Sequence, residues 1–429
     1  MSGPNRMRPF RQALIVLTAS SALIMSGTAQ AASTLTTPRL AGQKPDITSD
    51  EAGLWSIMDK AEQAAKTSAD RVTDPRLVDY LRGQTCKLAP EYCGELRVYA
   101  LQRPFFNATA APNGYIEIWT GLMLRAQTQS ELAFVLGHEI SHFSQNHSIE
   151  AWRATKTRNN IALALSLAVS AAGAAAASNA GSAQAAKDTL DAASSVSNII
   201  YLSTIAAYFS FSRDNESEAD TLGFNRATKI GLDPTAGAAI WKRLTDESLA
   251  SDFPKVRREP NRASIFDSHP INEVRMGALS SMAKDLKNAV PIDRKAELIA
   301  YRDLIRPYLS VWLRDDLRRK DYGQTLFLID QLSELGEDLG LLNYYRGEAY
   351  RLRRKAKDLD EAKQAYQNAT KSPDAPAETW RNLGDLAMAS KDNAAAIEAY
   401  QAYLIHAPQA QDRWIIEDNL SQLKAGPST

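Results

Sequence analysis

The sequence has no net charge and few cysteines. Its 429 residues include 50 basic and 50 acidic side chains, which gives a formal net charge of zero at pH 7. Nothing in this balance suggests electrostatic capture of nucleic acid, so we expect no nucleic-acid partner. Hydrophobic residues make up 44% of the chain. The chain can therefore bury a substantial core over two or three domains, and a disordered or fibrous protein is excluded.

The two cysteines, Cys86 and Cys93, flank the short segment 87–92. In an oxidising compartment, the simplest interpretation is one disulfide that closes a short loop and fixes a turn. A metal site with two thiolate ligands is the weaker alternative, because no histidine lies nearby. We therefore expect these cysteines to have a structural role.

The first 31 residues contain no acidic side chain. Three arginines between positions 6 and 11 precede an apolar stretch over 13–25, and a small-x-small sequence ends at Ala31. This order is typical of a cleavable signal peptide at 1–31, with an uncleaved membrane anchor as the alternative. The segment lacks paired arginines and a terminal cysteine, which argues against export in a folded state and against a lipid anchor. We expect a periplasmic protein, either soluble or peripheral to the outer membrane.

Long runs of large apolar residues are also missing from the rest of the chain. The most biased segment, 161–197, consists mainly of Ala, Ser and Gly and is poor in Leu, Ile and Phe. We favour a helical hairpin of small residues that packs against the protein or contacts a membrane surface, over a true membrane span.

The spacing of apolar residues predicts the order of the remaining elements. Residues 32–50 form a linker, and helical spacing begins at Glu51. Alternating patterns at 96–101 and 115–119 predict two strands, which Asn113-Gly114 could join as a hairpin with a long loop. Helices are expected from a capping box at Thr128, from Arg213 to Gly231 and over 236–249. Three prolines over 250–272 predict a long loop.

Beyond residue 284 the sequence is helical and repetitive. Tyr366 and Tyr400 are 34 residues apart, and Trp380, Gly384 and Pro408 fall at positions typical of a tetratricopeptide unit. Extra basic residues at 353–355 lengthen the preceding unit by about three positions. We predict a helical connector at 284–310 and a repeat domain at 311–424 that binds a protein partner. A plain helical cap without a partner is the alternative.

Three of the five histidines lie within ten residues, at His138, His142 and His147. The first two form an H-E-x-x-H motif with Glu139. Residues four apart share one face of a helix, so His138 and His142 can both bind one Zn²⁺, with Glu139 beside its open position. Two buried histidines without a metal are the alternative. His147 falls on another helical face, and we interpret it as structural or surface-exposed.

A third ligand can be found in the segment Glu216-Ser217-Glu218-Ala219-Asp220. Glu216 and Asp220 are one helical turn apart, so Glu216 can bind the metal while Asp220 accepts the second ring N–H of a metal-bound histidine. We expect Glu218 to point elsewhere, into solvent. An exposed acidic helix face is the alternative interpretation of this segment.

These motifs resemble a known family. The segments that carry the resemblance are His138-Glu139-x-x-His142, Glu216-x-x-Ala219-Asp220, Asn113-Gly114-Tyr115-Ile116 with Gly121-Leu122, and Ser268-His269-Pro270 with Arg275. Over residues 51–283 they are similar to the gluzincin peptidases of the CAAX prenyl protease and HtpX family. With the repeats and the signal, the whole chain is most similar to the periplasmic BepA group, which serves quality control of outer-membrane protein assembly.

The resemblance implies a fold, a site and an activity. It implies a mainly α protein: a zincin-like metalloprotease domain with a short β-hairpin or small sheet at 51–283, followed by an all-α tetratricopeptide-like solenoid. It implies one Zn²⁺ per chain, held by His138, His142 and Glu216, with Glu139 as general base and Asp220 behind the ligands. His269 would be a latch on the metal or a transition-state stabiliser.

The expected activity is cleavage of misfolded or stalled envelope proteins. An extended substrate could pair with the strand at 115–119, so Tyr115, Ile116, Ile118 and Arg275 are the expected substrate-binding residues. A partner on the repeats could belong to the outer-membrane assembly machinery. The alternative function is a periplasmic chaperone or scaffold that acts through its repeats and keeps a structural metal site.

Overall fold

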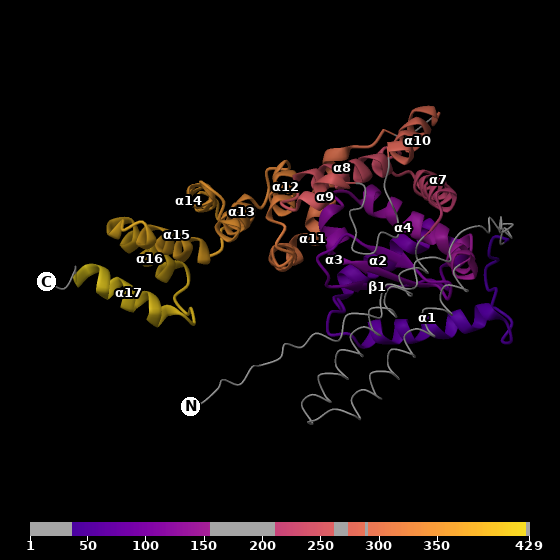
Figure 1. The fold of residues 1–429 in the computed structure, drawn as a ribbon, viewed down its shortest axis with the longest axis horizontal. Coiled ribbons are helices and arrows are strands. Elements are labelled where there is room, and N and C mark those ends of the chain that lie inside the picture. The colour runs from indigo at the N-terminus through magenta and orange to yellow at the C-terminus, as the bar shows by residue number, and fades with distance from the viewer. Residues whose placement is uncertain (1–36, 155–210, 261–272, 288–290, 426–429) are drawn as a thin grey trace, which may run out of the picture. The chain divides into compact units, whose positions relative to one another are not determined.

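The computed structural model describes residues 37–154, 211–260, 273–287 and 291–425 (Figure 1). The expected signal peptide at 1–31, the alanine-rich segment at 161–197 and His269 lie outside these described residues. Within them, every helix is too short or too polar to cross a lipid bilayer. The fold is mainly helical with one small sheet, as predicted.

The N-terminal part of the described chain combines helices with three strands. In chain order they are α1 (Asp50–Thr67), α2 (Pro75–Leu88), a short 3₁₀ turn η1 (Pro90–Tyr92), β1 (Arg97–Leu101), β2 (Ala108–Ala110), β3 (Tyr115–Trp119), α3 (Thr120–Arg125), α4 (Gln129–Ser144), α7 (Arg213–Lys229), α8 (Ala236–Ala250), α9 (Pro254–Arg258) and α10 (Glu273–Asp285). The helix α9 lies inside the segment that was expected to be a loop.

Helix α4 is at the centre of this part. It contacts α2, α7, α8 and β2, and nearly every one of its residues is buried. The side chain of Thr128 caps its N-terminus by accepting the Glu131 N–H, while the Glu131 carboxylate accepts the Gln127 N–H. Arg243 clamps that carboxylate through both oxygens, at 2.7 and 2.8 Å. The start of α4 is therefore fixed by hydrogen bonds that satisfy its free N–H groups.

The sheet differs from the predicted hairpin. Its strand order is β1-β3-β2, with β1 parallel to β3 and β2 antiparallel to β3. The strands at 97–101 and 115–119 are therefore not a hairpin, and that prediction was wrong. The Asn113-Gly114 turn instead joins β3 to β2, a strand of only three residues. Gly114 has φ +84°, and a Cβ there would lie 2.6 Å from the carbonyl oxygen of Glu95, so this turn requires glycine.

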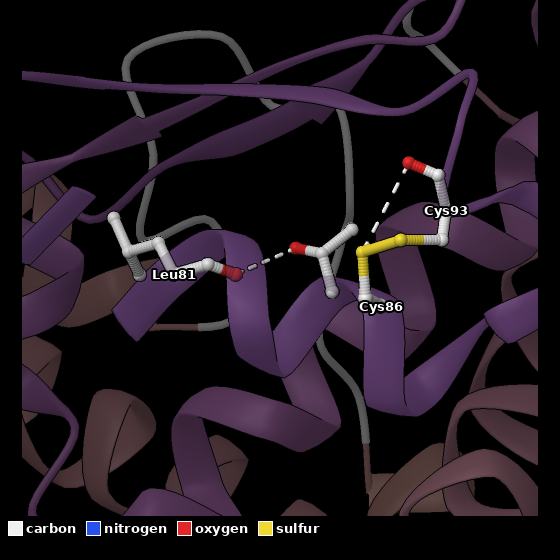
Figure 2. Close-up of a disulfide and its surroundings, with 4 residues drawn as sticks. Leu81, Cys86 and Cys93 are labelled. Atoms are coloured by element: carbon white, nitrogen blue, oxygen red, sulfur yellow. Dashed lines mark hydrogen bonds between the residues drawn. A yellow bond between two sulfur atoms is a disulfide. The ribbon is translucent and has the colours of Figure 1, made fainter. Parts of the chain in front are cut away.

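Cys86 and Cys93 form a disulfide, with their Cα atoms 4.6 Å apart (Figure 2). The bond connects the last turn of α2 to the residue that follows the 3₁₀ turn η1. It closes a short loop and fixes the path of the chain toward β1, which is the structural role expected of this pair.

The rest of the chain is helical. It contains α11 (Arg294–Leu317), α12 (Tyr322–Ser333), α13 (Leu339–Arg353), α14 (Asp358–Ala369), α15 (Glu378–Ala389), α16 (Asn393–His406) and α17 (Arg413–Ala425). Helix α13 packs on α14, and α15 packs on α16. A Cβ at Gly347 would meet the Tyr366 ring at 2.4 Å, and one at Gly384 would meet the Tyr400 ring at 2.5 Å. Both helix pairs thus use a glycine to admit a tyrosine ring.

Helix α11 runs without a break across residue 310, where the sequence suggested a boundary between connector and repeats. It contacts both α3 and α4, and the Tyr301 hydroxyl donates to the Met123 carbonyl at 2.8 Å. Its buried residues join the same hydrophobic core as those of α4. This long helix therefore belongs to the packing of the N-terminal part as well as to the helices that follow.

Candidate metal centre

Three buried side chains from two helices converge on one point. Nε2 of His138 and Nε2 of His142, one turn apart on α4, are 3.0 Å from each other. Each lies 3.6 Å from a carboxylate oxygen of Glu216 on α7. All three side chains are 1% exposed or less. Among the described residues, these three side chains form a group of His, Cys, Asp or Glu that could hold a metal ion.

The donor atoms suit Zn²⁺. Two imidazoles and one carboxylate are a common ligand set of catalytic zinc sites. Ligand atoms around a tetrahedral Zn²⁺ bonded at about 2.0–2.2 Å are about 3.3–3.5 Å apart, and the separations of 3.0 and 3.6 Å lie on either side of that range. Burying three unpaired polar groups together costs free energy, so a shared cation would stabilise this arrangement.

The close crossing of α4 and α7 brings these ligands together. A Cβ at Gly137 would meet the backbone oxygen of Gly223 at 3.1 Å, and a Cβ at Gly223 would meet the backbone nitrogen of His138 at 2.8 Å. The two helix backbones therefore touch where neither residue carries a side chain. Glu216 lies two turns before Gly223 on α7, so this contact sets its distance from the histidines.

A second set of side chains supports the first ligand. Asp220, one turn after Glu216, lies with Oδ1 3.0 Å from Nδ1 of His138. Arg275 on α10 donates to both oxygens of Asp220, at 2.6 and 2.8 Å. Burial opposes the ionisation of Asp220, but hydrogen bonds from Arg275 and His138 outweigh it and lower the pKa of this carboxyl from 3.8 to about 2. An ionised Asp220 can accept the Nδ1–H of His138 and leave Nε2 for a metal.

Arg275 contacts the ligands and not an open surface. Its side chain is 3% exposed, and Nη1 lies 2.7 Å from Oε2 of Glu216. The sequence suggested substrate binding for this residue, whereas in the structure its guanidinium pairs with the carboxylates of Glu216 and Asp220. Arg275 therefore offsets the negative charge that Glu216 and Asp220 bring into a buried space.

The proposed general base lies on the same helix. Glu139 follows His138 directly on α4 and is 3% exposed. It lies between His138 and His142, the two histidines that converge on Glu216. The other expected catalytic residue, His269, is outside the described residues.

His147 also contacts the candidate metal centre, which its helical spacing did not predict. Helix α4 ends at Ser144, and Asn146 has φ +58°, so the chain turns back. His147 is buried, with Nδ1 2.9 Å from Nδ1 of His142 and Nε2 3.3 Å from Oε2 of Glu218. Burial lowers the pKa of His147, which favours its neutral ring. The missed signal is the Gln145-Asn146 pair, which could have indicated a helix end before His147.

The predicted substrate strand is not an edge strand. β3 lies between β1 and β2, so its pairing groups are already used on both sides. Ile116 and Ile118 are 0% exposed in the core, and the Tyr115 hydroxyl donates to Glu117. Pairing of a substrate with 115–119 is therefore excluded, because an added strand needs a free edge.

Comparisons with known proteins agree with this geometry. Residues 85–283 match the peptidase family M48. Curated relatives include a beta-barrel assembly-enhancing protease of Escherichia coli K12, 26% identical over 52% of this chain and 42% of the relative. Another protein of that name, from Yersinia pestis, is 24% identical over 83% of this chain and 67% of the relative. The mitochondrial metalloendopeptidase OMA1 of Danio rerio is 26% identical over 43% of this chain and 35% of the relative.

The first of these relatives is matched over only about two fifths of its length. The family match covers all the residues that form the candidate metal centre. The chain therefore contains a domain of peptidase family M48, at residues 85–283.

Proposed function

We propose that the chain is a zinc-dependent metalloendopeptidase that cleaves misfolded or stalled proteins of the cell envelope. The observation that carries this proposal is the convergence of His138, His142 and Glu216 next to Glu139 on a buried helix. The match of residues 85–283 to peptidase family M48 supports the same reaction class.

In this mechanism, His138, His142 and Glu216 would hold Zn²⁺, which would supply a Lewis acid for the peptide carbonyl and the attacking water. Glu139 takes a proton from that water and passes it to the leaving amine nitrogen. Asp220 keeps the proton of His138 on Nδ1, so that Nε2 stays available as a ligand. Arg275 holds both acidic side chains of α7 in place.

We propose that substrate pairs with β2 in place of β3. Hydrogen bonds from Ala111 to Tyr115 and from Trp119 to Asn107 fix the β2–β3 ladder. By the alternation of an antiparallel ladder, the backbone groups of Ala108 and Ala110 point away from β3, where the Ala110 carbonyl accepts a long hydrogen bond of 3.4 Å from the Ser148 hydroxyl. The outer edge of β1 is occupied by the Val72–Ala100 and Gln102–Asp70 hydrogen bonds. β2 also contacts α4, so an extended chain along it would pass near the metal centre.

Strand pairing explains a preference for unfolded substrates, because a folded protein has few extended segments to offer. The names of the Escherichia and Yersinia relatives, beta-barrel assembly-enhancing proteases, support a role in envelope protein quality control. The signal-like segment at 1–31 supports a periplasmic location, soluble or peripheral to the outer membrane.

We further propose that a protein partner docks on the helical repeats. A groove of about 660 Å³ lies beside the α13–α14 connection, where the three extra residues 353–355 occur. Leu359, which lines this groove, is 49% exposed. Among the described residues, no ion pair engages Arg354 or Lys357 on its rim. An acidic segment with apolar side chains would suit this surface.

A chaperone or scaffold with a structural metal site is the second candidate function. It would need the three ligands but not Glu139, because a structural zinc site has no use for a base beside an open position. The buried position of Glu139 on the ligand helix favours the peptidase.

Comparison of the wild type with Glu139→Gln tests the proposal. The measurement is cleavage of an unfolded test protein by the purified chain, with and without a chelator, together with bound zinc. We expect wild-type cleavage that the chelator abolishes, and a variant that keeps its zinc and fold but loses at least about a thousandfold in rate. Cleavage by Glu139→Gln at the wild-type rate would overturn the assignment. Zinc binding without any cleavage by the wild type would favour the scaffold.

A further inference from the structure

His142 has a neighbour on the side of its ring that faces away from Glu216. Nδ1 of His142 lies 2.9 Å from Nδ1 of His147, and Nε2 of His147 lies 3.3 Å from Oε2 of Glu218. His147 is 2% exposed. The side chains thus form a chain of contacts from His142 through His147 to a carboxylate on α7.

The positions of the protons in this chain follow from the ligand geometry. Nε2 of His142 faces His138 and Glu216, so it must be unprotonated to bind a metal. The ring proton of His142 then sits on Nδ1, which lies 2.9 Å from Nδ1 of His147. That nitrogen must accept, so His147 carries its proton on Nε2, which faces Glu218.

From this geometry we infer that His147 and Glu218 are positioning residues for His142. Asp220 accepts directly from His138, whereas Glu218 acts on His142 through the ring of His147. Both ligand histidines are thereby held with Nε2 toward the metal and with a carboxylate behind them. The inference rests on the proposed zinc function, since it concerns how a metal ligand is oriented.

The surrounding structure holds the ring planes for this role. Phe211 stacks on His142, with ring centroids 3.8 Å apart and planes at 17°. The left-handed conformation of Asn146 turns the chain so that His147 returns to His142. Glu218 is different, because its side chain is 52% exposed. Water competes for its carboxylate, so it should contribute less than His147.

Simple packing is the rival explanation of His147, and the choice of variants separates the two. His147→Phe fills the space with a ring of similar shape but cannot accept the His142 N–H. Glu218→Gln keeps the size of the side chain and removes its charge. Asp214→Asn is the matched control, because Asp214 is an exposed carboxylate one turn before Glu218 on the same helix.

The experiment measures zinc affinity of the full chain by competition with a chromophoric chelator at fixed pH, and thermal unfolding of the metal-free chain. We expect His147→Phe to weaken zinc binding about 10- to 100-fold, Glu218→Gln to weaken it about two- to fivefold, and Asp214→Asn to leave it unchanged. In the His147→Phe background, Glu218→Gln should have no further effect, since Glu218 acts through His147.

Two outcomes would overturn the inference alone. One is a His147→Phe variant that binds zinc as tightly as the wild type; the other is Glu218→Gln with wild-type affinity. If His147→Phe does not fold, the Glu218→Gln result decides, since an exposed substitution leaves metal-free unfolding unchanged. A wild type that binds no zinc would overturn the proposed function and this inference together.

Discussion

Asp220 makes several buried contacts that hold the site together. It accepts from His138, from two nitrogens of Arg275 and, at 3.4 Å, from the indole of Trp241. Removing one member of a buried charged group leaves the others uncompensated, which costs about 3–5 kcal/mol. Helices α4, α7 and α10 therefore share one electrostatic network through Asp220.

The pH dependence of stability follows from the same residue. The pKa of Asp220 falls from 3.8 to about 2 on folding, so its contribution is present above pH 4 and is lost as the pH falls toward 2. The shift corresponds to about 2 kcal/mol. We predict that Asp220→Asn lowers the unfolding free energy at pH 7 and flattens its decline between pH 5 and pH 2. Urea unfolding measures this, with Asp214→Asn, at an exposed carboxylate on the same helix, as control; an unchanged slope would contradict it.

At this scale, the sequence predicted the cluster better than its surroundings. Spacing of four residues on a helix was enough to pair His138 with His142 and Glu216 with Asp220, because these geometries are local. Helical periodicity alone did not predict the contacts of His147 and Arg275, because one depends on where α4 ends and the other on which buried carboxylates α10 meets. Local periodicity carries no information on either.

Among the elements, the crossing of α4 and α7 decides whether the ligands can meet. A Cβ on Gly223 would fall 2.8 Å from the backbone nitrogen and 3.1 Å from the Cα of His138. Backbone atoms cannot rotate away as a flexible side chain can, so the helices would have to separate.

We therefore predict that Gly223→Ala destabilises the chain by about 1–3 kcal/mol and weakens zinc binding, although it touches no ligand. Gly83→Ala on α2 is the matched control, because a Cβ there meets nothing within 4 Å. That control should be neutral or more stable by up to about 1 kcal/mol. Chemical unfolding and chelator competition measure both effects. Equal behaviour of the two variants would show that the crossing tolerates a side chain.

The sheet shows where prediction of elements from sequence fails. The strands at 97–101 and 115–119 were visible as alternating patterns, but β2 has only three residues, Ala108–Ala110, and no such pattern. Without β2, two strands on either side of a turn suggest a hairpin; with it, β1 and β3 become parallel neighbours in a three-stranded sheet. Strand order depends on this pairing, so it could not be identified from sequence.

Across the whole molecule, buried charges connect the peptidase part with the first long helix of the C-terminal part. Arg125 on α3 pairs with Glu247 on α8 and with Asp316 on α11, all at 2.7 Å and almost fully buried. Arg319 adds a contact of 2.9 Å to Asp316. Residues so far apart in sequence cannot be paired by inspection. The network makes α11 an integral part of the peptidase packing, and the predicted boundaries at 283 and 310 remain predictions.

A further connection joins the repeat insertion to the end of α8. Lys355, in the extra residues between α13 and α14, forms an ion pair with Asp252, and Asp252 also accepts the Gly323 N–H at the start of α12. The basic groove therefore begins where α8, α12 and the α13–α14 connection meet. Arg354 and Lys357 line it without taking part in this ion pair.

These two cations allow docking to be separated from catalysis. We predict that Arg354→Glu/Lys357→Glu reduces by about tenfold the envelope proteins that co-purify with the full chain, because each reversed surface contact costs about 1 kcal/mol. Raising the salt concentration should release the same proteins from the wild type, since exposed charges are screened. Cleavage of an unfolded test protein should be unchanged.

The control is the double variant Lys363→Glu/Lys371→Glu, because both lysines are exposed, on or just after α14, and lie outside the groove. Equal loss in both double variants would mean that overall charge, and not this groove, governs docking.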